Sequence, residues 1–165
     1  PAACCAAADA WAFALAGNLI AAGARRDRLY QATEGAQHPA RLSLMGTALG
    51  RLEWLSDNQI AIMSLSHGDF EAAGSGPEVL AGVVNEPLSV HGCSVSVLCT
   101  EVTPGLVKVS MRSLLDGHGI PVVDVAEFAA QFGGGGHRTA AACRIPGNLA
   151  STIATIRDAL LATIS

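Results

Sequence analysis

The sequence is short of aromatic residues, of charge and of any basic excess. Aromatic side chains make up 4% of the 165 residues and charged side chains 15%, and 14 Asp and Glu outnumber 10 Lys and Arg to give a net charge of −4. Proteins that follow long nucleic acid backbones usually carry a basic surplus and aromatic stacking platforms, so the composition argues against such extended contact. It is compatible with a small pocket that needs only a few local cations.

The chain also lacks the patterns of a disulfide scaffold, a zinc site or a membrane span. Its five cysteines are odd in number and match no zinc spacing, so we expect reduced, mostly buried thiols in a cytoplasmic protein. No apolar run is long enough to span a bilayer, and we expect no membrane partner. The Ala-rich start has no basic leader, so we interpret it as a helix and not as a signal peptide.

What is present divides into two regions, residues 1–57 and residues 58–165. The first is predicted to be helical, with one helix over residues 10–22 that ends at Gly23 and another that begins at Pro39. Apolar residues three and four apart predict one buried stripe on the second helix. The expected stripe consists of Leu42, Met45, Leu49 and Leu52, with Ala48 and Leu55 beside it. Ser56, Asp57 and Asn58 break this pattern and mark the predicted boundary.

The second region is predicted to mix strands and helices. Residues 60–65 indicate a strand, and Pro77 suits the first turn of a helix that runs to about Glu86. Residues 93–100 and 106–113 indicate two strands joined as a hairpin. In the second of these strands, side chains alternate between an apolar face and a polar face. The apolar face holds Val107, Val109 and Met111, and the polar face holds Lys108, Ser110 and Arg112.

Two further helices complete the prediction. Asp124 and Glu127 have capping-box spacing and open a helix that ends near Phe132, and Asn148 caps a final helix. The last helix is expected to be buried through Leu149, Ile153, Ile156 and Leu160. We therefore predict an α/β fold with a mixed β-sheet flanked by helices, preceded by a separate helical segment.

Four consecutive glycines give the strongest indication of function. Gly133, Gly134, Gly135 and Gly136 stand between a predicted helix and an Ala-rich segment that is predicted to begin another helix before a short strand. Ordering each glycine costs roughly 0.5–1 kcal/mol relative to alanine, so a packed protein gains little from them unless the backbone approaches a ligand or adopts left-handed torsions. We interpret the run as a loop whose amide groups face an anion at a helix N-terminus.

Polar side chains near this loop extend the predicted site. His137 follows the glycines directly and can donate to a phosphate oxygen, and Arg138 is either a ligand or a solvated residue at the rim. Arg112 offers a planar fork that fits two phosphate oxygens, with Ser110 and Ser113 close to it in the sequence. Lys108 on the same face is expected to be solvated.

Catalytic machinery is not evident in the sequence. The remaining histidines and aspartates are scattered, and they form no Asp-His motif for a metal pair and no Ser-His-Asp arrangement. We therefore expect no catalytic residue and no metal ligand in this chain. On its own residues the chain is predicted to recognise phosphate without hydrolysing it.

At these residues the sequence resembles a known family. Residues 107–113, 123–125 and 132–142 match the pattern S-x-R-S, then V-D-V, then G-G-G-G-H-x-x-A-A-G, which is similar to the C-terminal DHH-associated (DHHA1) domain of the DHH phosphoesterase superfamily. The nearest types are the bacterial nanoRNase, pAp phosphatase and cyclic-dinucleotide phosphodiesterase proteins, with the RecJ-like exonucleases more remote. The resemblance covers roughly residues 59–165, and the helices before it resemble the end of a truncated DHH domain and its linker.

The resemblance implies a function for a longer parent enzyme. In that family the DHH domain carries two divalent metals, usually Mn²⁺, on Asp and His ligands, and hydrolyses phosphate esters. The C-terminal domain holds the nucleotide end of the substrate, which here assigns binding to residues 133–136, His137 and Arg112, with Ser110 and Ser113 as lesser candidates. The metal motifs are absent, so this chain resembles the C-terminal part of such an enzyme and is expected to bind no Mn²⁺ and to hydrolyse nothing alone. Ala142 replaces the last glycine of the motif.

Three functions stay open at this point. The first is the substrate-binding part of a phosphoesterase acting on short oligonucleotides, pAp-like nucleotides or linear and cyclic dinucleotides, in a parent that can form homodimers through its DHH domain. The second is a non-catalytic nucleic-acid-binding module, which the negative charge and few aromatics disfavour, because Trp11 and Trp54 are expected in the core. The third is a degenerate regulatory domain that senses a nucleotide. The expected partner in the first case is a short RNA or DNA oligonucleotide or a nucleotide phosphate.

Overall fold

A computed structural model describes residues 10–33 and 38–164, which fall into two compact units divided after Gln37. The first unit contains α2 (Ala10–Ala21) and α3 (Arg26–Thr33), and Gly23 follows α2 with a φ of +97°, as the sequence predicts for a helix end. None of the residues of α2 is buried, and Trp11 is 70% exposed. The prediction that Trp11 belongs to a core is therefore wrong. Cys4 and Cys5 lie outside the described residues.

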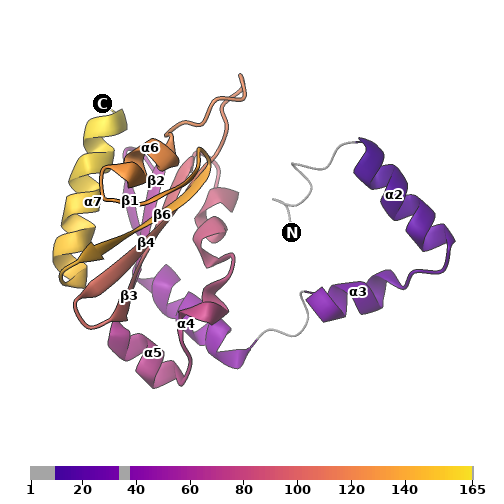
Figure 1. The fold of residues 1–165 in the computed structure, drawn as a ribbon, viewed down its shortest axis with the longest axis horizontal. Coiled ribbons are helices and arrows are strands. Elements are labelled where there is room, and N and C mark those ends of the chain that lie inside the picture. Colours follow the sequence, from indigo (N-terminus) through magenta and orange to yellow (C-terminus); the bar gives the residue numbers. More distant parts are fainter. Residues whose placement is uncertain (1–9, 34–37, 165) are drawn as a thin grey trace. The chain divides into compact units, whose positions relative to one another are not determined.

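The second unit is built on a six-stranded mixed sheet in the order β1-β2-β3-β4-β6-β5 (Figure 1). Its strands β2 and β3 run parallel, and every other neighbouring pair is antiparallel. The strands are β1 (Glu53–Leu55), β2 (Ile60–Leu65), β3 (Val95–Thr103), β4 (Leu106–Ser113), β5 (Gly135–His137) and β6 (Ala140–Pro146). The predicted hairpin of β3 and β4 is confirmed, and so is the fold class of a mixed sheet flanked by helices.

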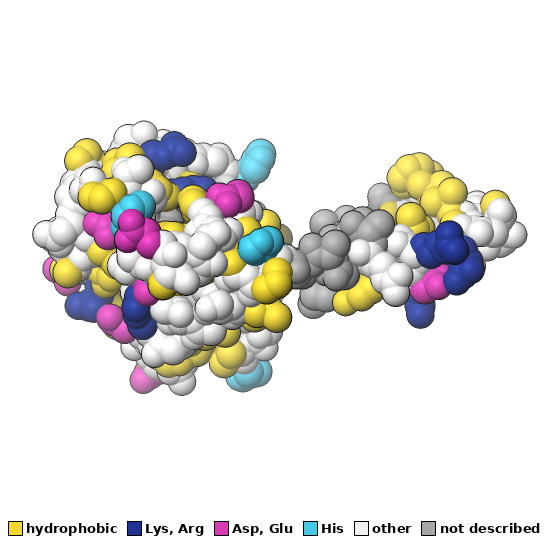
Figure 2. Space-filling view, turned by 90° about the horizontal axis from the view of Figure 1, so that it is seen from below, with side chains coloured by type: hydrophobic (Ala, Val, Ile, Leu, Met, Phe, Trp, Pro, Cys, Tyr) yellow, Lys and Arg dark blue, Asp and Glu magenta, His cyan; other side chains and the backbone are white. Residues whose placement is uncertain are grey.

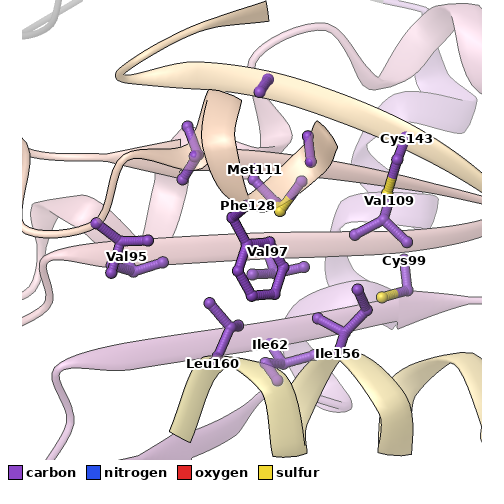
Figure 3. Close-up of a cluster of buried hydrophobic side chains, with 14 of the residues drawn as sticks. Ile62, Val95, Val97, Cys99, Val109, Met111, Phe128, Cys143, Ile156 and Leu160 are labelled. Atoms are coloured by element: carbon purple, nitrogen blue, oxygen red, sulfur yellow. The ribbon is translucent and has the colours of Figure 1, made fainter. Parts of the chain in front are cut away.

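Helices cover both faces of this sheet. The apolar side chains of β3 alternate, so that Val97 faces α6 (Val125–Ala130) and α7 (Leu149–Ile164), whereas Leu98 faces the opposite layer. That opposite layer consists of α4 (Pro39–Gly50), α5 (His67–Ala73) and two 3₁₀ helices, η1 (Pro77–Leu80) and η2 (Val83–Ser89). In Figure 3, Ile156 and Leu160 rise from α7 toward Ile62 and Val97, with Phe128 above them.

Two helices on one face of the sheet, α6 and α7, begin after the predicted capping residues. Asp124 Oδ1 accepts hydrogen bonds from the backbone amides of Ala126 and Glu127 at 3.1 and 3.2 Å, and α6 begins at the next residue. Asn148 Oδ1 accepts from Ser151 N at 2.8 Å ahead of α7, whose Ile156 and Leu160 are fully buried. Both helix starts are thus confirmed.

Helix α4 buries a different stripe from the one the sequence predicts. Its buried residues are Ala40, Leu44 and Ala48, while Leu42 is 62% exposed. Met45 and Leu52 pack at the edge of the same cluster. Small alanines let a helix approach its neighbours closely, so the alanine face is the one that packs against β2 and α5.

Two other predicted features take a different form. The helix expected from Pro77 to about Glu86 is two 3₁₀ helices, because Gly82 adopts a φ of +82° between them. Ser56, Asp57 and Asn58, predicted to mark a boundary, form the turn between β1 and β2 with positive φ values. The sheet therefore begins before residue 58, and α4 and β1 belong to the same compact unit as the later strands. No described helix is long and apolar enough to cross a membrane.

Candidate functional site

One row of side chains crosses the sheet at the end of β4. In the strand register, Arg112 of β4 lies opposite Ala140 of β6, and Ala140 lies opposite His137 of β5. Residues directly opposite one another in a sheet point to the same face. Arg112 and His137 therefore flank the small Ala140 on one face, although 25 positions separate them in the sequence.

A second row lies beside the first and is made of small residues. Ser110 lies opposite Ala142, and Ala142 lies opposite Gly135. These side chains share the face of Arg112 and His137, because they stand two residues away along each strand. The result is a shallow floor of small residues with cationic or hydrogen-bonding side chains along its edges.

The polar face of β4 borders a cavity of about 290 Å³ beneath η1 and η2. Lys108, Ser110 and Arg112 alternate with the buried Val107, Val109 and Met111, as predicted. The other side of the cavity comes from η1, η2 and the segment between them, with Glu78 as its acidic member. The cavity has room for a small ligand, in keeping with a pocket that uses few cations.

Arg112 has the strongest case as an anion ligand. Its side chain is half-buried, and Nη1 donates to the carbonyl oxygen of Met111 at 2.8 Å, which fixes the guanidinium at the cavity wall. Burial lowers the pKa of Arg112, since desolvation disfavours the charged form. An arginine nonetheless stays protonated at neutral pH, so a partly desolvated cation faces the cavity. An anion bound at the guanidinium would replace the favourable interaction with water that burial removes.

The glycine run has mostly structural causes. Gly133 adopts a φ of +70° and ends α6, and the amides of Gly133 and Gly134 donate to the carbonyl oxygens of Ala130 and Ala129. A Cβ on Gly134 would lie 2.5 Å from the Cβ of Cys143, and one on Gly136 would lie 2.5 Å from the carbonyl oxygen of Ala140. Only Gly135 has open space beside it and no left-handed φ. Gly135 is therefore the member of the run whose missing side chain the fold does not explain.

The interpretation of this run as a helix N-terminus is wrong. Gly135–His137 forms β5, and the Ala-rich segment forms β6, so the loop enters a β-hairpin and does not precede a helix. The amides of Gly133 and Gly134 are already used by α6 and are not free to bind an anion. The predicted contribution of these two amides to phosphate recognition is therefore lost.

The remaining predicted residues have different positions. His137 is exposed at the end of β5, in the row of Arg112. Arg138 is 66% exposed on its side chain and donates from Nε to Asp124 Oδ2 at 2.7 Å. Ser113 faces the core side of β4, donates to Leu114 O and accepts from Val123 N. Ser113 thus holds the chain that leads to α6 and does not line the cavity with Ser110.

Lys108 is the residue that sequence reasoning missed. It is half-buried and borders both the cavity beneath η1 and η2 and a second cavity of about 150 Å³. The second cavity is also lined by Gly133, Gly134, Ala142, Cys143 and Arg144. The expectation that Lys108 is simply solvated is wrong, because elements distant in the sequence enclose it.

Other reactive groups do not gather into a site. Among the described residues, no three His, Cys, Asp or Glu side chains lie close enough to hold a metal ion. Cys93, Cys99 and Cys143 are buried free thiols, as the sequence predicts. Burial raises the pKa of Cys99 to about 12, with smaller contributions from Cys143 and Glu53, so this thiol is not a nucleophile at neutral pH.

Comparison with protein families agrees with the motifs. The profile of the DHHA1 domain matches residues 57–165, which is more than half of the chain. The chain belongs to the DHHA1 domain family. This DHHA1 domain is a module associated with DHH-family phosphoesterases, and its S-x-R-S motif supplies Ser110 and Arg112 to the cavity. A comparison with curated protein sequences finds no match.

Two solved structures share the fold of the DHHA1 domain chain. An exopolyphosphatase-related protein from Bacteroides fragilis superposes with a TM-score of 0.81 at 24% identity, over 92% of this chain and 43% of that one. A pGpG-specific phosphodiesterase, PggH, from Vibrio cholerae gives a TM-score of 0.53 at 13% identity, over 94% of this chain and 52% of that one. The chain thus spans about half the length of either protein.

Proposed function

We propose that this chain binds the phosphate-bearing end of a short oligonucleotide, a pAp-like nucleotide or a linear or cyclic dinucleotide for a DHH-family phosphoesterase. Arg112 and His137 are the principal ligands of the phosphate, and Ser110 and Gly135 line the approach to it. The observation that carries the proposal is the row in which Arg112 and His137 flank Ala140. A planar guanidinium and an imidazole on one face can donate to different oxygens of one phosphate group.

The size and charge of the site support a small ligand. A cavity of about 290 Å³ with two cations on β4 suits a nucleotide better than a long polymer. On the face of the second unit that Figure 2 shows, basic side chains form small groups interspersed with acidic ones, with no continuous basic surface. This favours nucleotide binding over the alternative of a non-catalytic module that follows a nucleic acid strand.

The chemistry of hydrolysis belongs, in this proposal, to a DHH domain in a longer protein. Two Mn²⁺ ions held there would activate a water molecule for attack on the phosphate ester. The described residues of this chain do not fit such a metal pair, so no step of the reaction is assigned to them. Their role is to bind and orient the substrate, and homodimerisation through the DHH domain is part of the same proposal. The pGpG-specific phosphodiesterase that shares the fold is in keeping with a dinucleotide substrate.

Calorimetric titration of the 165-residue chain with AMP, pAp and the dinucleotide pApA tests the proposal. We expect saturable binding that weakens at least about tenfold in Arg112→Ala and in His137→Ala, since each variant loses a charge-assisted hydrogen bond. Arg157→Ala is the matched control, because Arg157 pairs with Glu53 on the α7 side of the sheet. Absence of binding, or equal loss in the control, would refute the proposed site. Affinity that rises steadily with RNA length would instead support the nucleic-acid-binding module.

A further inference from the structure

Two cations face each other directly across neighbouring strands. Lys108 of β4 lies opposite Arg144 of β6 in the strand register, so both side chains rise from the same face of the sheet. Like charges at directly opposite positions destabilise a sheet. This arrangement is unfavourable unless solvent or a bound anion offsets the repulsion.

Acidic side chains do not neutralise this pair. In the part of the chain that the structure describes, neither Lys108 nor Arg144 belongs to an ion pair. Glu101 is the acidic residue nearest along β3, and its carboxylate accepts hydrogen bonds from the backbone amides of His67 and Gly105. Glu78 borders the larger cavity with Lys108, but one of its oxygens accepts from Gly76 N, and it does not line the smaller cavity.

The space between the two cations is already formed. Lys108 and Arg144 both line the cavity of about 150 Å³, and the backbone of Gly133 and Gly134 forms part of its wall. No side chain at either glycine projects into it. The backbone amides of these glycines already donate hydrogen bonds to carbonyl oxygens of α6, so the positive charge at the cavity comes from the side chains of Lys108 and Arg144. A compact anion fits this combination of charge and bare backbone.

We propose that Lys108 and Arg144 form a second anion subsite that holds a phosphate group different from the one at Arg112 and His137. This inference rests on the proposed function for the identity of the ligand. Lys108 precedes Arg112 by four residues on β4, which corresponds to about 13 Å along a strand. Neither Arg112 nor His137 lines the smaller cavity, so a phosphate group held there between Lys108 and Arg144 is separate from one held in the row of Arg112 and His137. The ligand therefore carries two phosphate groups, as a 5′-phosphorylated dinucleotide does, with one in each subsite.

Titrations with pApA and with ApA, which lacks the 5′-phosphate, separate the two subsites. We expect the wild-type chain to bind pApA at least about tenfold more tightly than ApA, because one more charge-assisted contact forms. Lys108→Gln and Arg144→Gln act on one phosphate, and Arg112→Ala and His137→Ala act on the other. Because Arg112 and His137 are proposed to hold the phosphate-bearing end, Arg112→Ala and His137→Ala should abolish the preference for pApA, whereas Lys108→Gln and Arg144→Gln should weaken the binding of both ligands. If Lys108→Gln and Arg144→Gln bind both ligands like the wild type, the subsite is disproved while the proposed function stands.

Thermal unfolding with inorganic phosphate tests the subsite without a nucleotide. We expect phosphate to raise the melting temperature of the wild type and of Arg112→Ala, and to have a smaller effect on Lys108→Gln and Arg144→Gln. Lys108→Glu places a carboxylate opposite Arg144, so it should melt higher than Lys108→Gln in phosphate-free buffer and lose the response to phosphate. Retention of that response in these Lys108 and Arg144 variants would overturn the subsite. If the Lys108 and Arg144 variants lose the response to phosphate and the wild-type chain binds no dinucleotide, the subsite is supported and the proposed function is refuted.

Discussion

The Nε atom of Arg138 donates to Oδ2 of Asp124 at 2.7 Å, while Oδ1 of the same carboxylate caps α6. The carbonyl oxygen of Arg138 also accepts from Val125 N at 3.0 Å. Arg138 therefore fastens the β5–β6 turn to the start of α6. Its guanidinium is already engaged by an acidic partner, so it contributes to the shape of the site more than to the binding of an anion.

Substitutions at Arg138 and Asp124 should distinguish the contribution of the ion pair to stability from that of the helix cap. Arg138→Ala removes one exposed ion pair, so we expect only a small loss in the free energy of unfolding. Asp124→Ala removes the ion pair and both capping bonds and should destabilise the chain more than Arg138→Ala does. Urea denaturation measures both. Nucleotide affinity should fall far less in Arg138→Ala than in Arg112→Ala, and an equal fall would make Arg138 a direct ligand.

Alanine at single positions of the glycine run should have unequal effects. Gly134→Ala and Gly136→Ala place a methyl group against the backbone of β6, and Gly136 also has a φ of +152°, so each should cost more than about 1 kcal/mol of stability. Gly135→Ala meets nothing within 4 Å and should leave the stability unchanged or slightly higher. The Gly135 variant is thus the informative one for binding. Loss of nucleotide affinity at unchanged stability would place the ligand over Gly135, whereas unchanged affinity would contradict that placement.

The glycine run shows where local sequence misleads. The three alanines that come shortly after it, Ala140, Ala141 and Ala142, favour a helix by intrinsic propensity, and the sequence predicts one. In the structure these residues pair with β4 and continue the sheet. Pairing between strands about 30 residues apart outweighs a local preference of a few tenths of a kcal/mol per residue, and a single sequence does not display it.

The predictions for β4 succeeded and failed for related reasons. Its strict alternation of apolar and polar residues identifies both faces, and Arg112 and Ser110 lie on the polar one as predicted. The sequence does not reveal what covers that face. The cover over the larger cavity comes from η1 and η2, which precede β4 in the sequence. The smaller cavity beside Lys108 is lined instead by residues that follow β4, among them Gly133 and Gly134. On α4, two apolar stripes satisfy the same helical period, and only the packing selects the alanine side.

The Arg51–Asp69 pair should make the free energy of unfolding depend on pH in the acidic range. Arg51 donates to both carboxylate oxygens of Asp69 at 2.5 and 2.9 Å, and Ser66 donates to Oδ2 from its hydroxyl and its backbone amide. The Arg51 hydrogen bonds first, and those from Ser66 next, hold the pKa of Asp69 below its ordinary value. A lowered pKa in the folded state means that this stabilisation is complete above the ordinary carboxyl pKa of about 3.9 and disappears as the pH falls through the lowered value.

Asp69→Asn should therefore be less stable than the wild type at pH 7, by about 1 kcal/mol for a partly exposed pair that also belongs to a capping box. The difference should shrink below about pH 4, where the wild-type carboxyl group becomes protonated. Urea denaturation at a series of pH values measures it, with Glu71→Gln as a control on the exposed side of the same helix. A difference that stays constant down to pH 2 would contradict the assigned cause.

The methyl group of Ala142 should control access to the smaller cavity. Ala142 lies between Ser110 and Gly135 in the sheet and lines the cavity that Lys108 and Arg144 share. Ala142→Val suits a strand and fills the space, so we expect unchanged or higher stability and a loss of pApA affinity. Ala142→Gly enlarges the cavity and restores the glycine of the family motif, at a cost of roughly 0.5–1 kcal/mol in stability. We expect it to keep or raise the affinity. Calorimetry with both variants measures the effect, and equal affinity in the valine and glycine variants would show that the ligand does not reach this part of the sheet.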